Sequence, residues 1–154
     1  MTAITFLFCA AGMYFEPAAP GGACPHAAPV LIDAAGIHAG AAQLRFAGAR
    51  PGATIEPESP LAGVSNYFHG RNAGRSRTGV PHYGRLRIHG LYPATDVVLY
   101  GRGGKLEFDY VLAPGARVDR IAIDFRGSPV HLKADGDLEA GVIVQRRPKV
   151  FQNG

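Results

Sequence analysis

The chain has 154 residues, a formal net charge of +4 and a pI near 9.3, a size typical of one domain with a single core. Gly contributes 21 residues, Pro 12 and Trp none, a composition that favours short strands and tight turns over helices. No apolar run reaches the roughly 18 residues that a membrane-spanning helix needs, so the sequence predicts no membrane span.

The first apolar segment, residues 4–15, is either a signal peptide or a pair of core strands. Its N-terminal side carries no Lys or Arg, and Phe8 precedes Cys9 where a lipoprotein signal needs a small residue. We therefore expect two core strands, Ile4–Phe8 and Met13–Glu16, joined by a turn.

Residues 17–40 are rich in Ala, Gly and Pro, and we expect them to be poorly structured, with Val30–Ile32 as the one plausible strand. The two cysteines of the chain, Cys9 and Cys24, can form one disulfide in an oxidising compartment. The sequence leaves open whether they pair, and no compartment follows from them.

The next segment has short strands interrupted by prolines. Gln43–Phe46 and Ala53–Glu56 read as strands, and Pro57–Pro60 is expected to break the second one. Ser65–His69 is a brief aromatic strand. The ten residues Gly70–Gly79 form a polar loop, longer than most connections in a compact domain and of a kind that often binds ligands.

The middle of the chain carries the clearest strand pattern. Apolar and polar residues alternate over 85–89 and again over 106–112, the period of two that marks half-buried strands. Between these runs, Gly101–Gly104 offers positions where positive φ costs little. We therefore expect Val97–Tyr100 and Leu106–Asp109 to pair as a hairpin.

Four further strands are predicted near the C-terminus. Arg120–Phe125 alternates apolar and polar residues, and Gly141–Gln145 is a last apolar strand. Val130–Ala134 and Asp137–Ala140 flank Asp135-Gly136, a dipeptide that favours a type I′ hairpin turn.

No segment shows two turns of helical periodicity. We therefore predict one all-β domain over residues 1–154, built as an antiparallel sandwich or a bent meander of short strands and hairpins.

A basic segment provides candidate ligand-binding residues. Between His69 and Lys105 the sequence has seven Lys and Arg residues against the single acid Asp96, a charge that attracts polyanions. Aromatic residues interleave with them and can stack on sugars or bases. The candidates are Arg71, Arg75, Arg77, His82, Tyr83, Arg85 and Arg87. An acidic glycan is the expected polyanion, and nucleic acid is not expected as a partner.

The alternative interpretation of this segment is a solvated face whose arginines pair with acids, among them Glu107, Asp109 and Asp124. Glu107 and Asp109 also share one strand face, roughly 6–7 Å apart, a spacing that suits acid and base work on a glycosidic bond. Such placement is equally typical of any solvent-facing strand, so we expect no catalytic residue.

The sequence predicts no metal site and no cofactor. Cys24-Pro25-His26 offers two zinc ligands, whereas a structural zinc site needs four at recognisable spacing.

Ordered motifs over about residues 44–152 give a family resemblance. They are Ser65–Phe68, Arg77–Tyr83, Leu91–Pro93, Asp96, Tyr100–Gly101, Leu106–Val111, Ala113–Ala116, Ala134–Leu138, Arg147–Pro148 and Phe151–Gln152. In these motifs the chain resembles an uncharacterised domain found near the N-terminal end of large secreted bacterial proteins, which continue into seven-bladed β-propeller (SBBP-type) repeats.

The resemblance implies an extracellular or cell-surface location and a non-enzymatic scaffold or binding role. Ser76 stands where the family usually has a Trp, and family members run on through further strands beyond the position of Gly154. We therefore expect a truncated or divergent copy, and a truncated copy would lack the C-terminal strands of the family.

The leading hypothesis is a non-catalytic β module of a secreted or cell-surface bacterial protein, acting in scaffolding or attachment to neighbouring domains. A polyanion- or glycan-binding domain that uses the Arg-rich face of residues 69–89 is one alternative, and a carbohydrate-active enzyme is another.

Overall fold

The computed structural model describes residues 4–10, 12–18, 30–68, 70 and 76–151. In these residues the fold is nearly all β, and every strand pair is antiparallel, which confirms the predicted fold class. Only one short 3₁₀ turn, η2 (Val118–Arg120), interrupts the described strands.

The strands have the following bounds. They are β1 (Phe6–Cys9), β2 (Tyr14–Pro17), β3 (Val30–Asp33), β4 (Gly36–Ala39), β5 (Ala42–Ala47), β6 (Thr54–Tyr67), β7 (Arg77–Tyr92), β8 (Thr95–Arg102), β9 (Lys105–Leu112), β10 (Ala122–Arg126), β11 (Val130–Leu132), β12 (Leu138–Ala140) and β13 (Ile143–Gln145).

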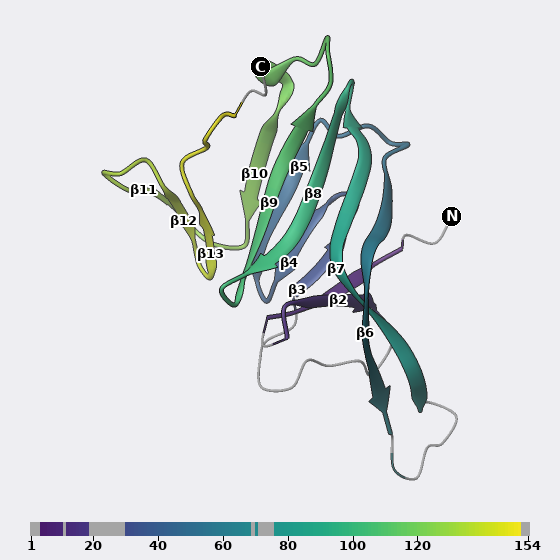
Figure 1. Cartoon of the computed structure of the whole chain (residues 1–154). Coiled ribbons are helices and arrows are strands. Elements are labelled where there is room, and N and C mark those ends of the chain that lie inside the picture. Colours follow the sequence, from purple (N-terminus) through teal and green to yellow (C-terminus); the bar gives the residue numbers. More distant parts are fainter. Residues whose placement is uncertain (1–3, 11, 19–29, 69, 71–75, 152–154) are drawn as a thin grey trace.

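Two sheets contain these strands. The main sheet has the order β10-β5-β4-β3-β1-β2-β7-β8-β9, and β6 pairs with β7 outside this path. It curls into a half-barrel, while β11, β12 and β13 form a small sheet that stands to one side of it (Figure 1). The far parts of β6 and β7, residues 61–67 and 77–83, project beyond the main sheet and are called the arm below (Figure 1).

The core fills the concave side of the half-barrel. Alternation places Leu86 and Ile88 of β7 in it, both fully buried, while the side chain of Arg85 is exposed. Across the concave side, the Phe46 ring of β5 meets the Phe108 ring of β9 edge to face, with ring centroids 6.0 Å apart. Strands that lie far apart in the sheet order therefore touch through their side chains, and this contact stabilises the curl.

The Tyr92 side chain links the end of β7 to β5 and β10 on the opposite side of the half-barrel. Its side chain is buried, and its hydroxyl lies 3.0 Å from both the Ala47 and the Ala122 carbonyl oxygens, on β5 and β10. Burial raises the pKa of this hydroxyl, so it stays protonated and able to donate. One side chain thus joins three strands at the rim of the half-barrel.

The two core strands predicted at the N-terminus are confirmed. β1 and β2 pair with the register Phe8↔Phe15, and both of these rings are buried. Cys9 is buried at the end of β1 and is disulfide-bonded. Cys24, the partner considered from the sequence, lies outside the described residues.

The predicted break at Pro57–Pro60 is wrong. β6 runs as one strand from Thr54 to Tyr67, with register shifts between Pro60 and Val64 and again before Tyr67. Because β6 pairs with β7 alone, its prolines remove no hydrogen bond from a second neighbour, and an edge strand tolerates them.

Within residues 17–40, the predicted strand Val30–Ile32 is confirmed as β3, but the prediction that the rest is poorly structured is wrong for residues 33–39. Residues 30–39 form the β3–β4 hairpin inside the main sheet, with Ile32 and Ile37 paired and buried. The Asp33 carboxylate accepts hydrogen bonds from the backbone N–H groups of Ala35 and Gly36, which closes the turn. Residues 19–29 lie outside the described part.

The hairpin around Asp135-Gly136 forms, but its turn is not type I′. Gly136 has φ of +88°, whereas Asp135 is not among the described residues with positive φ, and a type I′ turn needs both. The Gly136 N–H instead donates to the Lys133 carbonyl. The two-residue turn with positive φ at both positions is Gly103-Gly104, in the predicted β8–β9 hairpin.

Candidate functional site

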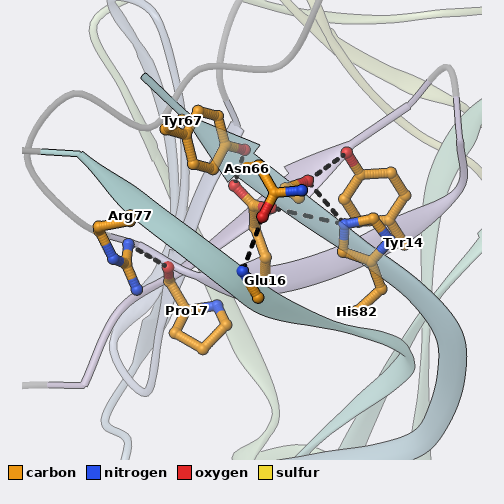
Figure 2. A network of polar contacts seen from close by, with 9 residues as sticks. Tyr14, Glu16, Pro17, Asn66, Tyr67, Arg77 and His82 are labelled. Carbon is orange, nitrogen blue, oxygen red and sulfur yellow. Dashed lines mark hydrogen bonds and ion pairs between the residues drawn. The ribbon is translucent and has the colours of Figure 1, made fainter. Parts of the chain in front are cut away.

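A buried polar network lies where β2 passes under the arm (Figure 2). Its members, called the Glu16 network below, are Tyr14, Glu16, Ser65, Tyr67 and His82. Alternation along β2 sends Phe15 into the core and Glu16 to the opposite face, which the arm covers. Glu16 is only 1% exposed, and a buried carboxylate is costly unless neighbouring groups stabilise it.

The two oxygens of Glu16 have different surroundings. The Tyr67 hydroxyl donates a hydrogen bond to Oε1. Oε2 is buried without a hydrogen-bond partner and lies 3.8 Å from Nε2 of His82. One carboxylate oxygen thus accepts a hydrogen bond from the arm, and the other lies near the ring nitrogen of His82 without a hydrogen bond.

His82 is the centre of the remaining contacts. Its Nε2 lies 2.7 Å from the Ser65 hydroxyl oxygen, which is 3.4 Å from the Tyr14 hydroxyl oxygen. The Tyr14 and His82 rings stack with centroids 3.6 Å apart and planes 12° from parallel (Figure 2). These contacts come from β2, β6 and β7, so the network joins the N-terminal hairpin to the arm.

A serine, a histidine and a carboxylate in contact are the residue types of a nucleophilic triad, but their geometry here differs from one. In a triad the serine and the carboxylate approach opposite ring nitrogens of the histidine. Here Ser65 and Glu16 both approach Nε2 of His82. The arrangement therefore suits a structural link between β2 and the arm.

The Tyr67 hydroxyl is held protonated in this link. Burial first, and then the hydrogen bond to Glu16, raise its pKa from its ordinary value of 10.0 to about 12. In the folded state Tyr67 keeps a proton that the unfolded chain loses near pH 10. The stability that this raised pKa contributes is therefore complete below pH 10. It is lost as the pH rises through about 12.

Replacing Tyr67 with Phe removes the donor to a buried carboxylate, and we expect it to lower the free energy of unfolding by about 1.5–3 kcal/mol. Tyr100→Phe is the matched control, because the Tyr100 hydroxyl donates to the exposed carboxylate of Asp109, 2.9 Å away. We expect the control to cost less than about 1 kcal/mol in urea denaturation. Equal losses for the two variants would contradict a stabilising role for the Glu16 network.

The candidate ligand-binding residues are dispersed in the structure. Arg71 and Arg75 lie outside the described residues. Arg77 places Nη1 3.5 Å from the Pro17 carbonyl oxygen (Figure 2), and His82 belongs to the Glu16 network. Tyr83 is half-buried against the core, and of the described candidates only Arg85 and Arg87 extend from the convex face of the main sheet.

Arg87 is already paired on that face. Its Nε lies 2.6 Å from Glu58 Oε1, and its Nη1 lies 3.5 Å from Asp96 Oδ2. The hydrogen bond to Glu58 raises the pKa of the guanidinium further. His89 lies 3.3 Å from Glu56 and 3.5 Å from Asp96, so carboxylates alternate with basic groups across β6, β7 and β8.

The alternative interpretation, that acids pair with the arginines of the basic segment, is confirmed for Glu107, whereas Asp124 pairs with an arginine outside that segment. Glu107 lies 3.5 Å from Arg102, and Asp124 lies 2.7 Å from Arg126. Asp109 accepts its hydrogen bond from Tyr100. The partners of Arg87 come from β6 and β8, which local sequence does not place beside it.

Two adjoining hollows lie at the end of β5, with volumes of about 500 and about 470 Å³. The first lies between Arg50 and Arg120, and the second also borders Arg50. Neither of these two hollows is lined by a residue of the Glu16 network or of the Arg85–Arg87 segment. The sequence analysis named neither Arg50 nor Arg120 as a candidate.

The chain matches, over residues 13–154, a family model described as a domain of unknown function, DUF7948. The chain belongs to the DUF7948 family. No curated protein and no solved structure matches it. The matched range of this DUF7948 domain contains the whole Glu16 network and both hollows.

The described residues of the DUF7948 domain contain neither a metal-ligand cluster nor a membrane-spanning helix. Within the described residues, no three His, Cys, Asp or Glu side chains are grouped so that they could hold a metal ion. Cys24 and His26, the two ligands considered from the sequence, lie outside that part of the chain. The described residues also contain no helix with the length and apolar character needed to cross a membrane.

Proposed function

We propose that this DUF7948 domain is a non-catalytic β module of a secreted or cell-surface bacterial protein, and that it attaches to a neighbouring domain through its small sheet. The observation that carries the proposal is the exposure of apolar side chains on that sheet. Of the fifteen exposed large apolar side chains in the described residues, Val130, Leu132 and Val144 lie on its strands and Val142 lies in the turn before β13.

The small sheet is covered at one end only. On one face, Ala140 is fully buried and Ile143 packs against the core. Leu132 pairs with Leu138 and therefore lies on the same face, yet it is 73% exposed. The opposite face presents Val144, also exposed. Apolar surface that continues past the covered end is typical of a surface that binds another protein.

The disulfide at Cys9 supports the proposed location. Disulfide bonds persist in oxidising environments, which include the outside of the cell, and are rare in the cytosol. The family resemblance to domains of secreted bacterial proteins points to the same location.

The contacts of Glu107 and Asp109 support a non-catalytic role. The two carboxylates lie on the convex face of β9, where Arg102 and Tyr100 contact them. Neither of the two hollows at the end of β5 is lined by them. A pair of carboxylates that acts on a glycosidic bond needs a site around it that holds the substrate.

Hydrogen exchange tests the attachment. The complete reading frame that contains this chain is expressed, and the amide exchange of β11–β13 is compared with that in residues 1–154 alone. We expect slower exchange in the complete protein, and the protection should be lost in Leu132→Lys. Val64→Lys, at another exposed apolar residue, on β6, is the control and should leave the protection unchanged.

Two outcomes would overturn the proposal. One is the same exchange of β11–β13 in both proteins. The other is a reading frame that encodes no second domain, because attachment within one chain then has no partner.

A further inference from the structure

The larger hollow at the end of β5 has a floor of apolar and aromatic residues. It opens where the end of β5, the β7–β8 turn and the start of β10 meet, and it has a volume of about 500 Å³. Ala47, Tyr92, Pro93 and Ala122 contribute to its lining. This volume lies within the range of about 300–1,000 Å³ that is common for small-molecule sites.

Arg50 and Arg120 also line the hollow, and no carboxylate does. Arg87, Arg102, Arg117 and Arg126 each have a carboxylate oxygen within 4.0 Å. In the described part of the chain, neither Arg50 nor Arg120 has such a partner. The two exposed guanidinium groups therefore make the hollow positive.

The acid closest in sequence to Arg120 is already bound elsewhere. Asp119 accepts hydrogen bonds from both Nε and Nη2 of Arg117, at 3.0 and 2.5 Å. These bonds are the largest cause of the lowered pKa of Asp119, which stays charged and paired with Arg117. The charge of Arg120 also lowers the pKa of Asp119, but Arg120 forms no ion pair with it within 4.0 Å.

Both arginines extend from backbone that hydrogen bonds hold in place. The Arg50 N–H donates to the Leu91 carbonyl at 2.9 Å, and the Arg50 carbonyl accepts from the Ala53 N–H at 3.1 Å. The Arg120 N–H donates to the Arg117 carbonyl at 3.1 Å within η2. A fixed backbone lowers the entropy that binding a ligand must overcome.

The Arg50 guanidinium passes over the β7 backbone at Gly90. A Cβ atom at that position would lie 3.8 Å from Arg50 Nη1, an ordinary van der Waals contact. The Gly90 N–H donates to Asp96 Oδ1, 2.8 Å away, and this carboxylate also lies 3.5 Å from both Arg87 and His89.

The second hollow is less suited to an anion. It shares Ala47, Gly48 and Arg50 with the first, but Asp124 lines it. Asp124 neutralises Arg126 there, with Nε and Oδ2 2.7 Å apart. Arg45 also lines the second hollow, so the two hollows are equally positive, but only the first has a lining without a carboxylate.

We propose that the hollow between Arg50 and Arg120 binds the oxyanion group of a small acidic ligand, with a compact body such as a sugar ring resting on the apolar floor. Guanidinium groups bind carboxylate and phosphate oxygens through paired N–H donors. The exposed Pro93 ring, with Ala47 and Ala122 beside it, offers the apolar surface that such a body needs. This site is separate from the proposed attachment surface, and it differs from the Arg-rich face predicted from sequence.

The test is a titration followed by amide chemical shifts, with glucuronate, glucose 6-phosphate, inorganic phosphate and uncharged glucose as probes. We expect saturable shifts at Gly48, Arg50 and Ala122 with at least one charged sugar and none with glucose. Arg50→Ala and Arg120→Ala should each weaken this binding at least about tenfold. Preference for glucuronate or for glucose 6-phosphate then identifies the oxyanion as carboxylate or phosphate.

Arg85→Ala is the matched control. Arg85 is exposed on β7, has no carboxylate partner among the described residues, and its replacement changes the net charge by the same amount. We expect the control to change the affinity less than twofold, and the spectra of all three variants to show an intact fold.

The proposal is overturned if Arg85→Ala weakens binding as much as Arg50→Ala, because net charge alone would then explain it. It is also overturned if no probe gives saturable shifts at the hollow, or if inorganic phosphate binds as tightly as both sugars. Each of these results leaves the exchange experiment on the small sheet unaffected.

Discussion

Gly127→Ala is expected to lower the free energy of unfolding by about 4 kcal/mol or more, enough to unfold much of a marginally stable domain. Gly127 follows β10 and has φ of +76°, a conformation that costs other residues about 1–2 kcal/mol. A Cβ atom there would also lie 1.8 Å from the Ala41 carbonyl oxygen. The backbone of the β4–β5 turn would have to move to admit the methyl group.

Gly103→Ala separates the two causes. Gly103 has φ of +57° in the β8–β9 turn, but nothing lies within 4 Å of the position of its Cβ atom. We expect this variant to lose only the conformational part, about 1–2 kcal/mol. Urea denaturation of both proteins gives the comparison, and equal losses would show that the Gly127 contact with Ala41 does not constrain the chain.

The hairpins were predictable because their signals are local. Alternation and a run of glycines placed β8 and β9 opposite each other, and the structure has Tyr100 paired with Glu107 as expected. Where local rules conflict, tertiary context decides. Pro57 and Pro60 argue against a strand in isolation, yet β6 accommodates them because its other edge pairs with no strand of the main sheet.

The curl of the main sheet could not be predicted from sequence. It depends on the contact of Phe46 with Phe108 and on the reach of Tyr92 across to Ala47 and Ala122. These residues are separated by 30 to 62 positions, and no alternation pattern specifies which strands face each other across a half-barrel.

The Glu16 network and the hollow show two different reasons why sites were missed. Glu16 had a sequence signal, because a carboxylate that follows the apolar run of residues 4–15 breaks its pattern. Arg50 and Arg120 had none, since they are single arginines 70 positions apart in turns. Counting charge along the chain drew attention to residues 69–89 instead, where Glu58 and Asp96 neutralise Arg87.

Phe15→Ala is the second change with a large expected effect, a loss of about 3–5 kcal/mol. The Phe15 ring is 0% exposed, lies 5.0 Å from the Phe8 ring, and comes from the residue paired with Tyr83 of β7. In the sheet order β2 lies between β1 and β7. The cavity left by the missing Phe15 ring would therefore open where the N-terminal strands join β7 in the main sheet.

Phe108→Ala is the comparison, and its ring is only half-buried at the rim of the half-barrel. The sequence placed this ring on the core side of β9, which the contact with Phe46 confirms, but incomplete burial lowers the expected loss to about 1–3 kcal/mol. Denaturation of both variants measures the difference. A smaller loss for Phe15→Ala than for Phe108→Ala would mean that the half-barrel is held by its rim contacts, and that the N-terminal hairpin only covers it.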